Sequence, residues 1–339
     1  MPTVSIAFQT NKRAQAYIDL AKHVDQYAFD AVSVYCDAPY HTSYGPLLLM
    51  APHITRARLG CAAISPARMA PIDIAADAAL LADYAQAGTY LGIARGAWLD
   101  DYGISEPSKP IQAIRETIAI VRALWSGQPA GYDGQVYRLA AHVKADYPLP
   151  SQPIPIMIGS WGAKLCALAG EVADEVKVGG SANPDVVPVI RAYIANGEQT
   201  AQRRPGSVGI ALGAVTVVDA DRAQARQAAR EAAVLYLPVV VPLDPSVSVE
   251  PELIARLRVC ADRGDFRAGA ALISDELLDR FAFAGDCTDL IAQCERLYAA
   301  GVDRIEFGTP HGLRDAAAGI TLLGGTVLPA LQQMGYLRA

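Results

Sequence analysis

The sequence predicts an α/β protein, specifically a TIM (β/α)8 barrel, and three observations favour that fold class. Short runs rich in Val, Ile and Leu alternate with longer amphipathic segments along the whole chain. The runs are continuously apolar, as expected of a parallel sheet whose outer side helices cover. The 339 residues also match the length of one such barrel. An open doubly wound sheet is the alternative that this alternation permits.

Each expected element rests on its own periodicity. Strands are predicted where β-branched and apolar residues run together, at residues 4–8, 31–35, 59–64, 90–94, 154–158, 176–178, 208–218 and 304–307. Helices are predicted where apolar residues recur every three or four positions, at residues 13–27, 70–85, 111–125, 163–170, 184–196 and 221–236. Eight strands is the number that closes a TIM barrel.

Two insertions interrupt the alternation within what we interpret as a single domain over residues 1–339. The first, at about residues 128–150, contains a hairpin pattern around Asp133-Gly134. The second, at about residues 242–282, contains helical fragments and no predicted barrel strand, and it precedes the last strand. We find no repeat and no linker that would divide the chain.

Composition excludes several classes of protein. Apolar residues make up 52% and charged residues 19% of the chain, with a net charge of −6. This balance is globular and argues against a nucleic-acid or membrane-surface partner, both of which require clustered Lys and Arg. The chain enters a strand pattern directly after Met1 without a signal-like segment, so a cytoplasmic location is expected. Six scattered Cys without a CxxC pair predict free thiols and no metal site.

The most informative stretch is PIMIGSWG at residues 155–162, a buried strand that ends at a glycine-rich turn before a helix. The next strand also ends in glycines, Gly179 and Gly180. Glycine allows close approach of the backbone, and the N-terminus of a helix favours an anion. In a TIM barrel the active site lies at the carboxyl ends of the strands. Small residues dominate these ends, which suits a large planar cofactor that carries the chemistry itself.

Several motifs together resemble the bacterial luciferase-like superfamily. They are LGIARGA (residues 91–97), LWSG (124–127) with YDG (132–134), and PIMIG (155–159) with AGE (169–171) and AD (173–174). The C-terminal part is similar to the methylenetetrahydromethanopterin reductase branch, through GDF (264–266), ISDELLDRF (273–281), AGV (300–302) and GTPHG (308–312). The resemblance covers nearly the whole chain.

The resemblance implies a TIM barrel that transfers hydride between the deazaflavin coenzyme F420 and a small organic substrate. It also implies a non-prolyl cis peptide, here between Ala62 and Ala63, in a bulge that supports the cofactor ring. The cofactor-binding residues that it implies are Ala62, Ala63, Ile64, Gly96, Gly159, Ser160, Gly162, Gly179, Gly180 and Ser181. The alternatives are a trans strand end at Ala62 and tight strand–helix packing at the glycines.

The chain departs from this branch at two positions. Ala7 and Ala97 stand where the resemblance implies acidic residues for substrate binding or proton donation. A pterin substrate is therefore not expected. Asp100 and Asp101 follow closely and are candidates to replace the missing acids, or else solvated residues near a helix start.

Other polar and aromatic residues are candidates at the same barrel end. Asp37, His41 and Arg95 are the candidate catalytic residues, and Trp98 and His311 are the candidate substrate-binding residues. The alternatives are a capping role for Asp37, a surface position for His41 and an ion pair of Arg95 with a neighbouring acid such as Asp37 or Glu306. Trp98 and Trp161 are expected either to form a wall of the pocket or to pack beneath it.

The function predicted from these observations is an F420-dependent oxidoreductase. FMN-dependent luciferase-like monooxygenase activity is the alternative, and a non-catalytic cofactor-binding protein is a second one. The expected partner is a small-molecule substrate, and the resemblance implies a homodimer or homotetramer.

Overall fold

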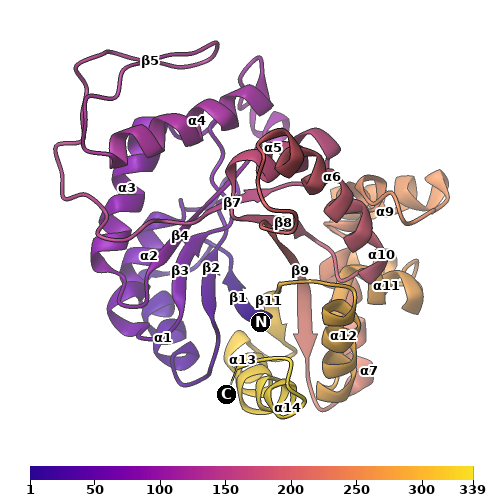
Figure 1. Cartoon of the computed structure of the whole chain (residues 1–339). Coiled ribbons are helices and arrows are strands. Elements are labelled where there is room, and N and C mark those ends of the chain that lie inside the picture. The colour runs from indigo at the N-terminus through magenta and orange to yellow at the C-terminus, as the bar shows by residue number, and fades with distance from the viewer. Residues whose placement is uncertain (339) are drawn as a thin grey trace.

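The computed structural model describes residues 1–338 and shows a closed barrel of parallel strands (Figure 1). Each strand pairs with the next around the barrel, and β11 returns to β1. The eight barrel strands are β1 (Thr3–Phe8), β2 (Ala31–Val34), β3 (Arg58–Cys61), β4 (Thr89–Ala94), β7 (Ile156–Gly159), β8 (Glu175–Gly179), β9 (Gly209–Val218) and β11 (Arg304–Gly312). The predicted TIM barrel is confirmed, because the β8–β9 pairing closes the sheet.

Helices surround the barrel on its outer side (Figure 1). The main helices are α1 (Ala14–Val24), α2 (Tyr44–Met50), α3 (Pro71–Tyr84), α4 (Pro110–Trp125), α5 (Ala163–Val172), α6 (Val187–Thr200), α7 (Arg222–Ala233), α8 (Leu237–Val240), α9 (Pro251–Arg263), α10 (Phe266–Ala270), α11 (Asp275–Phe281), α12 (Cys287–Ala299), α13 (Ala316–Leu322) and α14 (Leu328–Gln333). Shorter helical turns are η1 (Ala51–His53), η2 (Asp100–Tyr102), η3 (Pro184–Val186), η4 (Val241–Leu243) and η5 (Leu323–Val327). Their apolar faces and the outward faces of the strands form the main core.

The interior face of the barrel combines small residues with a few charged ones. Side chains alternate between the two faces of a strand, so residues paired across parallel strands share a face. The register pairs Lys177 of β8 with Ala211 of β9, and Ala211 in turn with Arg304 of β11. Gly213 of β9 pairs with Glu306 of β11. Four charged side chains therefore point into the barrel, from Glu175, Lys177, Arg304 and Glu306.

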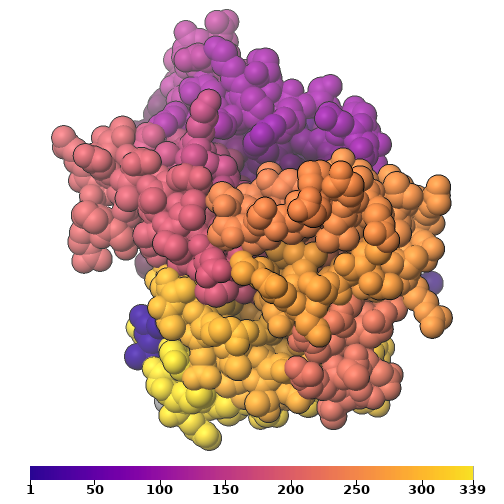
Figure 2. All heavy atoms as spheres, turned by 90° about the vertical axis from the view of Figure 1, so that its right-hand side faces the viewer, coloured from indigo at the N-terminus to yellow at the C-terminus, as the bar shows by residue number. Residues whose placement is uncertain are grey.

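Both insertions have the predicted character. The first contains an antiparallel hairpin of β5 (Tyr132–Asp133) and β6 (Arg138–Leu139), which extends away from the barrel (Figure 1). Its turn spans residues 134–137, because the N–H of Gly134 donates to the carbonyl of Tyr137. The second insertion carries α9, α10 and α11. Figure 2 shows their orange atoms as a block across one face, between purple atoms above and yellow atoms below.

One strand was missing from the sequence-based expectation. β10 (Ala282–Gly285) follows α11 and pairs in parallel with the second half of β9. It lies outside the closed ring, because β8 pairs with the first half of β9 along the same edge. The run Ala-Phe-Ala-Gly is too short and too poor in β-branched residues to indicate a strand by pattern.

Two further features of residues 1–338 bear on function. Within that range, none of the helices has both the length and the apolar character that crossing a bilayer requires. In the same range, His, Cys, Asp and Glu do not gather in groups of three that could hold a metal ion.

Candidate active site

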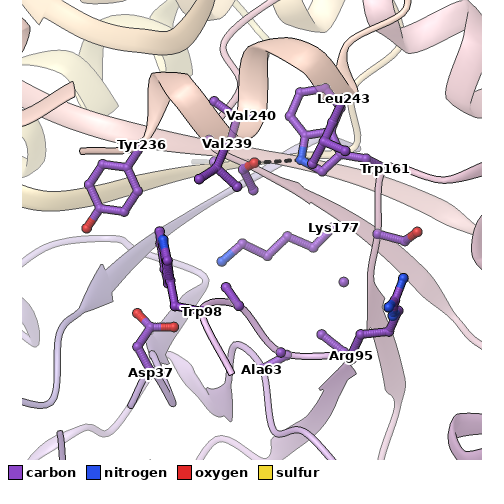
Figure 3. A pocket seen from close by; sticks show the side chains of 18 of the residues that line it. Asp37, Ala63, Arg95, Trp98, Trp161, Lys177, Tyr236, Val239, Val240 and Leu243 are labelled. Carbon is purple, nitrogen blue, oxygen red and sulfur yellow. Dashed lines mark hydrogen bonds between the residues drawn. The ribbon is translucent and has the colours of Figure 1, made fainter. Parts of the chain in front are cut away.

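A cavity of about 910 Å³ opens at the carboxyl ends of the barrel strands (Figure 3). Loops that follow β2, β3, β4, β7 and β8 line it, and the segment from α7 to η4 closes one side. Most residues singled out from the sequence lie here: Asp37, Ala62, Ala63, Arg95, Gly96, Trp98, Gly159, Ser160, Gly162, Gly179 and Gly180. The cavity thus lies at the end of the barrel where the sequence analysis places the site.

The chain bulges immediately after β3. Gly60 pairs with Tyr90 and Ile64 pairs with Ile93, so four steps along one strand face three along the next. The extra residue lies in the segment that contains Ala62 and Ala63, and the peptide bond between these two is cis, as expected. Both alanines line the cavity. The bulge thus presents a surface of methyl groups and backbone to the cavity.

A second wall comes from the glycine-rich ends of β7 and β8. Gly162 and Gly179 face open space, since a Cβ built on either would have no neighbour within 4 Å. The indole Nε1 of Trp161 donates to the carbonyl of Gly179 at 2.9 Å and joins the two loops. α5 begins at Ala163, and Lys164 in its first turn also lines the cavity.

Asp37 lies at the cavity beside Gln9. Its Oδ2 accepts a hydrogen bond from Gln9 Nε2 at 2.9 Å. Burial raises the pKa of Asp37, although the Gln9 hydrogen bond opposes that shift. The Asp37 side chain lines the cavity. It does not cap the next helix, because the residue that precedes α2 is Ser43.

Arg95 lines the cavity, but its guanidinium is engaged by a neighbour. Its Nε and Nη2 donate to the two carboxylate oxygens of Glu106 at 3.1 and 2.6 Å. The structure thus shows the alternative considered for Arg95, an ion pair with a neighbouring acid, and the acid is Glu106 instead of Asp37 or Glu306. Half of the Arg95 side chain is exposed (53%), so this pair stabilises the fold little.

The buried charged residues in the barrel were not anticipated as part of the site. Glu306 is fully buried and accepts hydrogen bonds from Lys177 Nζ, Ser33 Oγ and Arg304 Nη1, the last at 3.2 Å. Arg304 also donates to Glu175 through Nε at 2.9 Å. Lys177 also lines the cavity, from the interior of the barrel. The sequence contained a signal for this buried group, because two otherwise apolar strands carry charged residues at alternate positions. These residues are Glu175 and Lys177 on one strand, and Arg304 and Glu306 on the other.

Apolar side chains form a wall opposite Ala63 in Figure 3, and Trp98 joins them from the side where Asp37 lies. Trp98 and Tyr236 meet edge to face with ring centroids 6.0 Å apart. Val239, Val240 and Leu243 lie on the same side as Tyr236 in Figure 3. Trp98, which follows β4, is one of the candidates singled out from the sequence. The rest of the wall comes from the segment between α7 and η4, which was predicted as a helix and an insertion without a role in the site.

Four of the sequence-based candidates do not line the cavity. His41 is exposed, whereas Ile64, Ser181 and His311 are buried. The Nε2 of His311 lies 3.3 Å from the carbonyl of Phe307, and its ring packs against Phe8. Burial lowers the pKa of His311 to about 4. His311 is therefore a neutral core residue instead of a titrating group at the barrel mouth.

The two alanines at the departure points occupy different environments. Ala7 is buried inside the barrel, whereas Ala97 is exposed and lines the cavity. Asp100 and Asp101 line the cavity too, on the short turn η2. Carboxylates thus remain at the cavity edge although position 97 carries none.

Comparison with known proteins assigns the chain to a family. A sequence model described as luciferase-like monooxygenase matches residues 2–304. The 5,10-methylenetetrahydromethanopterin reductase of Methanolobus tindarius is 27% identical over 334 residues, covering 96% of this chain and 99% of the relative. The F420-dependent glucose-6-phosphate dehydrogenase of Kineococcus radiotolerans is 24% identical over 285 residues, covering 82% of this chain and 79% of the relative.

Solved structures share the fold. The coenzyme F420-dependent tetrahydromethanopterin reductase from Methanopyrus kandleri matches with a TM-score of 0.87 at 22% identity, covering 97% of this chain and 99% of that chain. The oxygenating constituent of 3,6-diketocamphane monooxygenase from Pseudomonas putida, solved with FMN, matches with a TM-score of 0.67 at 16% identity, over 97% and 99% of the two chains. Both are evidence for the barrel alone.

The relatives that match most of the chain are oxidoreductases, and this chain is an enzyme of the same class. The chain belongs to the luciferase-like monooxygenase family, whose sequence model matches almost its whole length. The resemblance inferred from the motifs is confirmed.

Proposed function

We propose that this protein is an F420-dependent oxidoreductase that transfers hydride between the deazaflavin coenzyme and a small organic compound. The support from sequence is that relatives matching most of the chain are named as a 5,10-methylenetetrahydromethanopterin reductase and an F420-dependent glucose-6-phosphate dehydrogenase. The support from the structure is the cavity and the residues that line it, which are suited to a planar ring at one end and an anionic tail at the other.

The observation that carries the proposal is the set of small residues around the bulge. Ala62, Ala63, Ala94 and Gly159 line one region of the cavity. A Cβ on Gly159 would lie 3.2 Å from the Cβ of Ala94, so this surface is closely packed, and these four residues project nothing larger than a methyl group. A flat heteroaromatic ring fits against such a surface, and the volume of about 910 Å³ is in the range of cofactor sites.

The other end of the cavity fits a phosphate-bearing tail. Gly162 precedes α5 and Gly179 ends β8, and neither has a side chain that would obstruct a ligand. The N–H groups of the first turn of α5 favour an anion. Lys164 adds a positive charge at the same rim. We propose Ser160, Gly162, Gly179 and Gly180 as tail-binding residues.

The coenzyme, when bound, supplies a ring carbon that gives or takes a hydride. The chain's own residues then have two tasks. The apolar wall of Trp98, Tyr236 and Leu243 excludes water and orients the substrate opposite the bulge. Asp37, with its pKa raised by burial, is positioned to hold a proton at the cavity surface. We further propose a substrate other than the pterin of the relatives, because Ala7 and Ala97 carry no acid.

The test is a pair of fluorescence titrations of the purified protein, one with F420 and one with FMN. The proposal predicts that F420 binds at least ~10-fold more tightly than FMN, a difference of about 1.4 kcal/mol in binding free energy. Tight and selective FMN binding would instead support the alternative, an FMN-dependent monooxygenase, which the family description and the FMN-bound neighbour suggest. Binding of neither cofactor would contradict both.

A further inference from the structure

The cavity contains a buried ammonium group. Among the described residues, three basic side chains line the cavity, from Arg95, Lys164 and Lys177, and only Lys177 is buried. In Figure 3 the Lys177 side chain extends across the middle of the view, with its nitrogen toward the side where Trp98 lies. Arg95 is occupied by Glu106. Lys177 is therefore the cation that a ligand in the interior of the cavity would meet.

The ammonium of Lys177 has donors to spare. It carries three N–H groups, and within residues 1–338 Glu306 is its sole hydrogen-bond acceptor. The ring of Tyr35 covers another side, with its centroid 5.1 Å from Nζ. A buried donor without an acceptor is costly. Because Lys177 lines the cavity, a ligand there can place an acceptor atom beside Nζ and pair one of these N–H groups.

The surrounding charges determine which acceptor fits. Lys177 and Arg304 are positive, Glu175 and Glu306 are negative, and ion pairs connect all four. The group is formally neutral, so an anionic ligand would find no excess positive charge to offset its desolvation. A neutral oxygen acceptor gains the hydrogen bond without that cost. The arrangement favours a carbonyl over a carboxylate.

The wall beside this donor is apolar. Trp98 and Tyr236 present aromatic edges and faces, and Val239, Val240 and Leu243 continue the surface. Such a wall binds the body of a flat or bulky apolar compound. One polar donor within an apolar cavity fixes the orientation of the compound that it binds.

We propose that Lys177 and this apolar wall form a substrate subsite for ketones or aldehydes with an apolar body, whose carbonyl oxygen accepts a hydrogen bond from Lys177. This inference rests on the proposed function, whose substrate class it names. On reduction the carbonyl carbon takes the hydride and the C=O double bond becomes single. The oxygen takes a proton from Asp37, which regains one from water, and the two electrons come from the reduced coenzyme. The hydrogen bond stabilises the charge that develops on the oxygen.

The experiment compares acetophenone with ethylbenzene, which has nearly the same shape but no acceptor, in ligand-observed NMR titrations of the purified full chain. We expect acetophenone to bind roughly 10- to 100-fold more tightly, the range for one hydrogen bond from a charged donor. Lys177→Met should reduce this ratio to about one. Lys22→Met, which removes an exposed lysine of α1, should leave it unchanged.

An unchanged ratio in Lys177→Met, or no preference in the unmodified protein, overturns the proposal. If Lys177→Met fails to fold because the buried Glu306 loses one of its two cations, Lys177→Met/Glu306→Gln removes both charges and decides the same question. The F420 titration is independent of these probes. Loss of F420 binding with a retained acetophenone preference contradicts the proposed function alone, and the converse result contradicts this inference alone.

Discussion

The ammonium of Lys177 donates a hydrogen bond to the carboxylate of Glu306 across the interior of the barrel. Lys177 lies on β8 and Glu306 on β11, with β9 between them. The pair can meet because β9 contributes only Ala211 and Gly213 at this level. A structural ion pair of the barrel core thereby reaches the surface of the cavity.

Replacing Glu306 should destabilise the fold strongly. Glu306→Gln leaves Lys177 and Arg304 buried without their shared carboxylate, and breaking a buried pair in this way costs about 3–5 kcal/mol. Denaturant unfolding measures the change in the free energy of unfolding. Glu276→Gln is the matched control, because its pair with Arg280 is exposed and should contribute about 0–1 kcal/mol. Equal effects of the two substitutions would contradict the assignment.

The contribution of Glu306 should also depend on pH. Burial alone would raise the pKa of Glu306, but Lys177 and Arg304 lower it below its usual value of 4.5. A carboxylate with a lowered folded-state pKa stabilises the fold above its unfolded pKa and loses that contribution as pH falls through the folded one. The stability difference between the unmodified protein and Glu306→Gln should therefore be constant above about pH 5 and shrink at lower pH. A difference that grows on acidification would exclude this origin.

His311 should give a second pH dependence, in a higher range. Burial lowers its pKa from 6.5 to about 4 in the folded protein. The unfolded chain then binds a proton that the folded one does not, so stability falls as pH decreases from 6.5 to 4, by about 3 kcal/mol in all.

Unfolding of His311→Asn over this range provides the check, because Asn tolerates the positive φ of 79° at this position. The variant should lose the slope between pH 6.5 and 4. His142→Asn, at an exposed position, should retain it. Protonation of His311 near pH 6.5 in an NMR titration of the folded protein would refute its burial as a neutral ring.

Thiol labelling should divide the cysteines into two groups. Cys61, Cys166 and Cys294 are buried, and burial raises the pKa of Cys61 to about 12 and of Cys166 to about 11. These thiols should react with a disulfide reagent at pH 8 only after denaturant is added. Cys36, Cys260 and Cys287 are partly exposed and should react in the folded protein. Rapid native labelling of Cys61, identified by peptide mapping, would be inconsistent with this core.

The fold could be predicted because its determinants are local. Apolar runs such as residues 208–218 match the long strand β9 closely, and each predicted helix has its counterpart. β10 was not predicted, because it is stabilised by pairing with β9, whose residues are more than sixty positions away in the sequence. The helix α12 could have been found, since Asp286 and Asp289 form a capping box at its start.

The site was predictable where it is made of backbone and unpredictable where it depends on packing. The glycines at 159, 162 and 179 mark the cavity, as their spacing indicated. His311 follows a strand end like the others, yet a register shift between Gly308 and His311 accompanies its burial beside Phe8. The partner of Arg95 is set by the loop that carries Glu106, for which the sequence has no periodic signal.

The central claim is that the glycine-lined cavity binds F420, and Gly179→Leu tests it most directly. The new side chain has free space and an ordinary backbone conformation, so the protein should fold while the cavity is partly filled. Gly45→Leu on α2 is the control, with the same free space away from the cavity. In fluorescence titrations with F420, we predict at least ~100-fold weaker binding for Gly179→Leu and unchanged binding for Gly45→Leu. Equal F420 affinity in both variants would contradict the placement of the cofactor in this cavity.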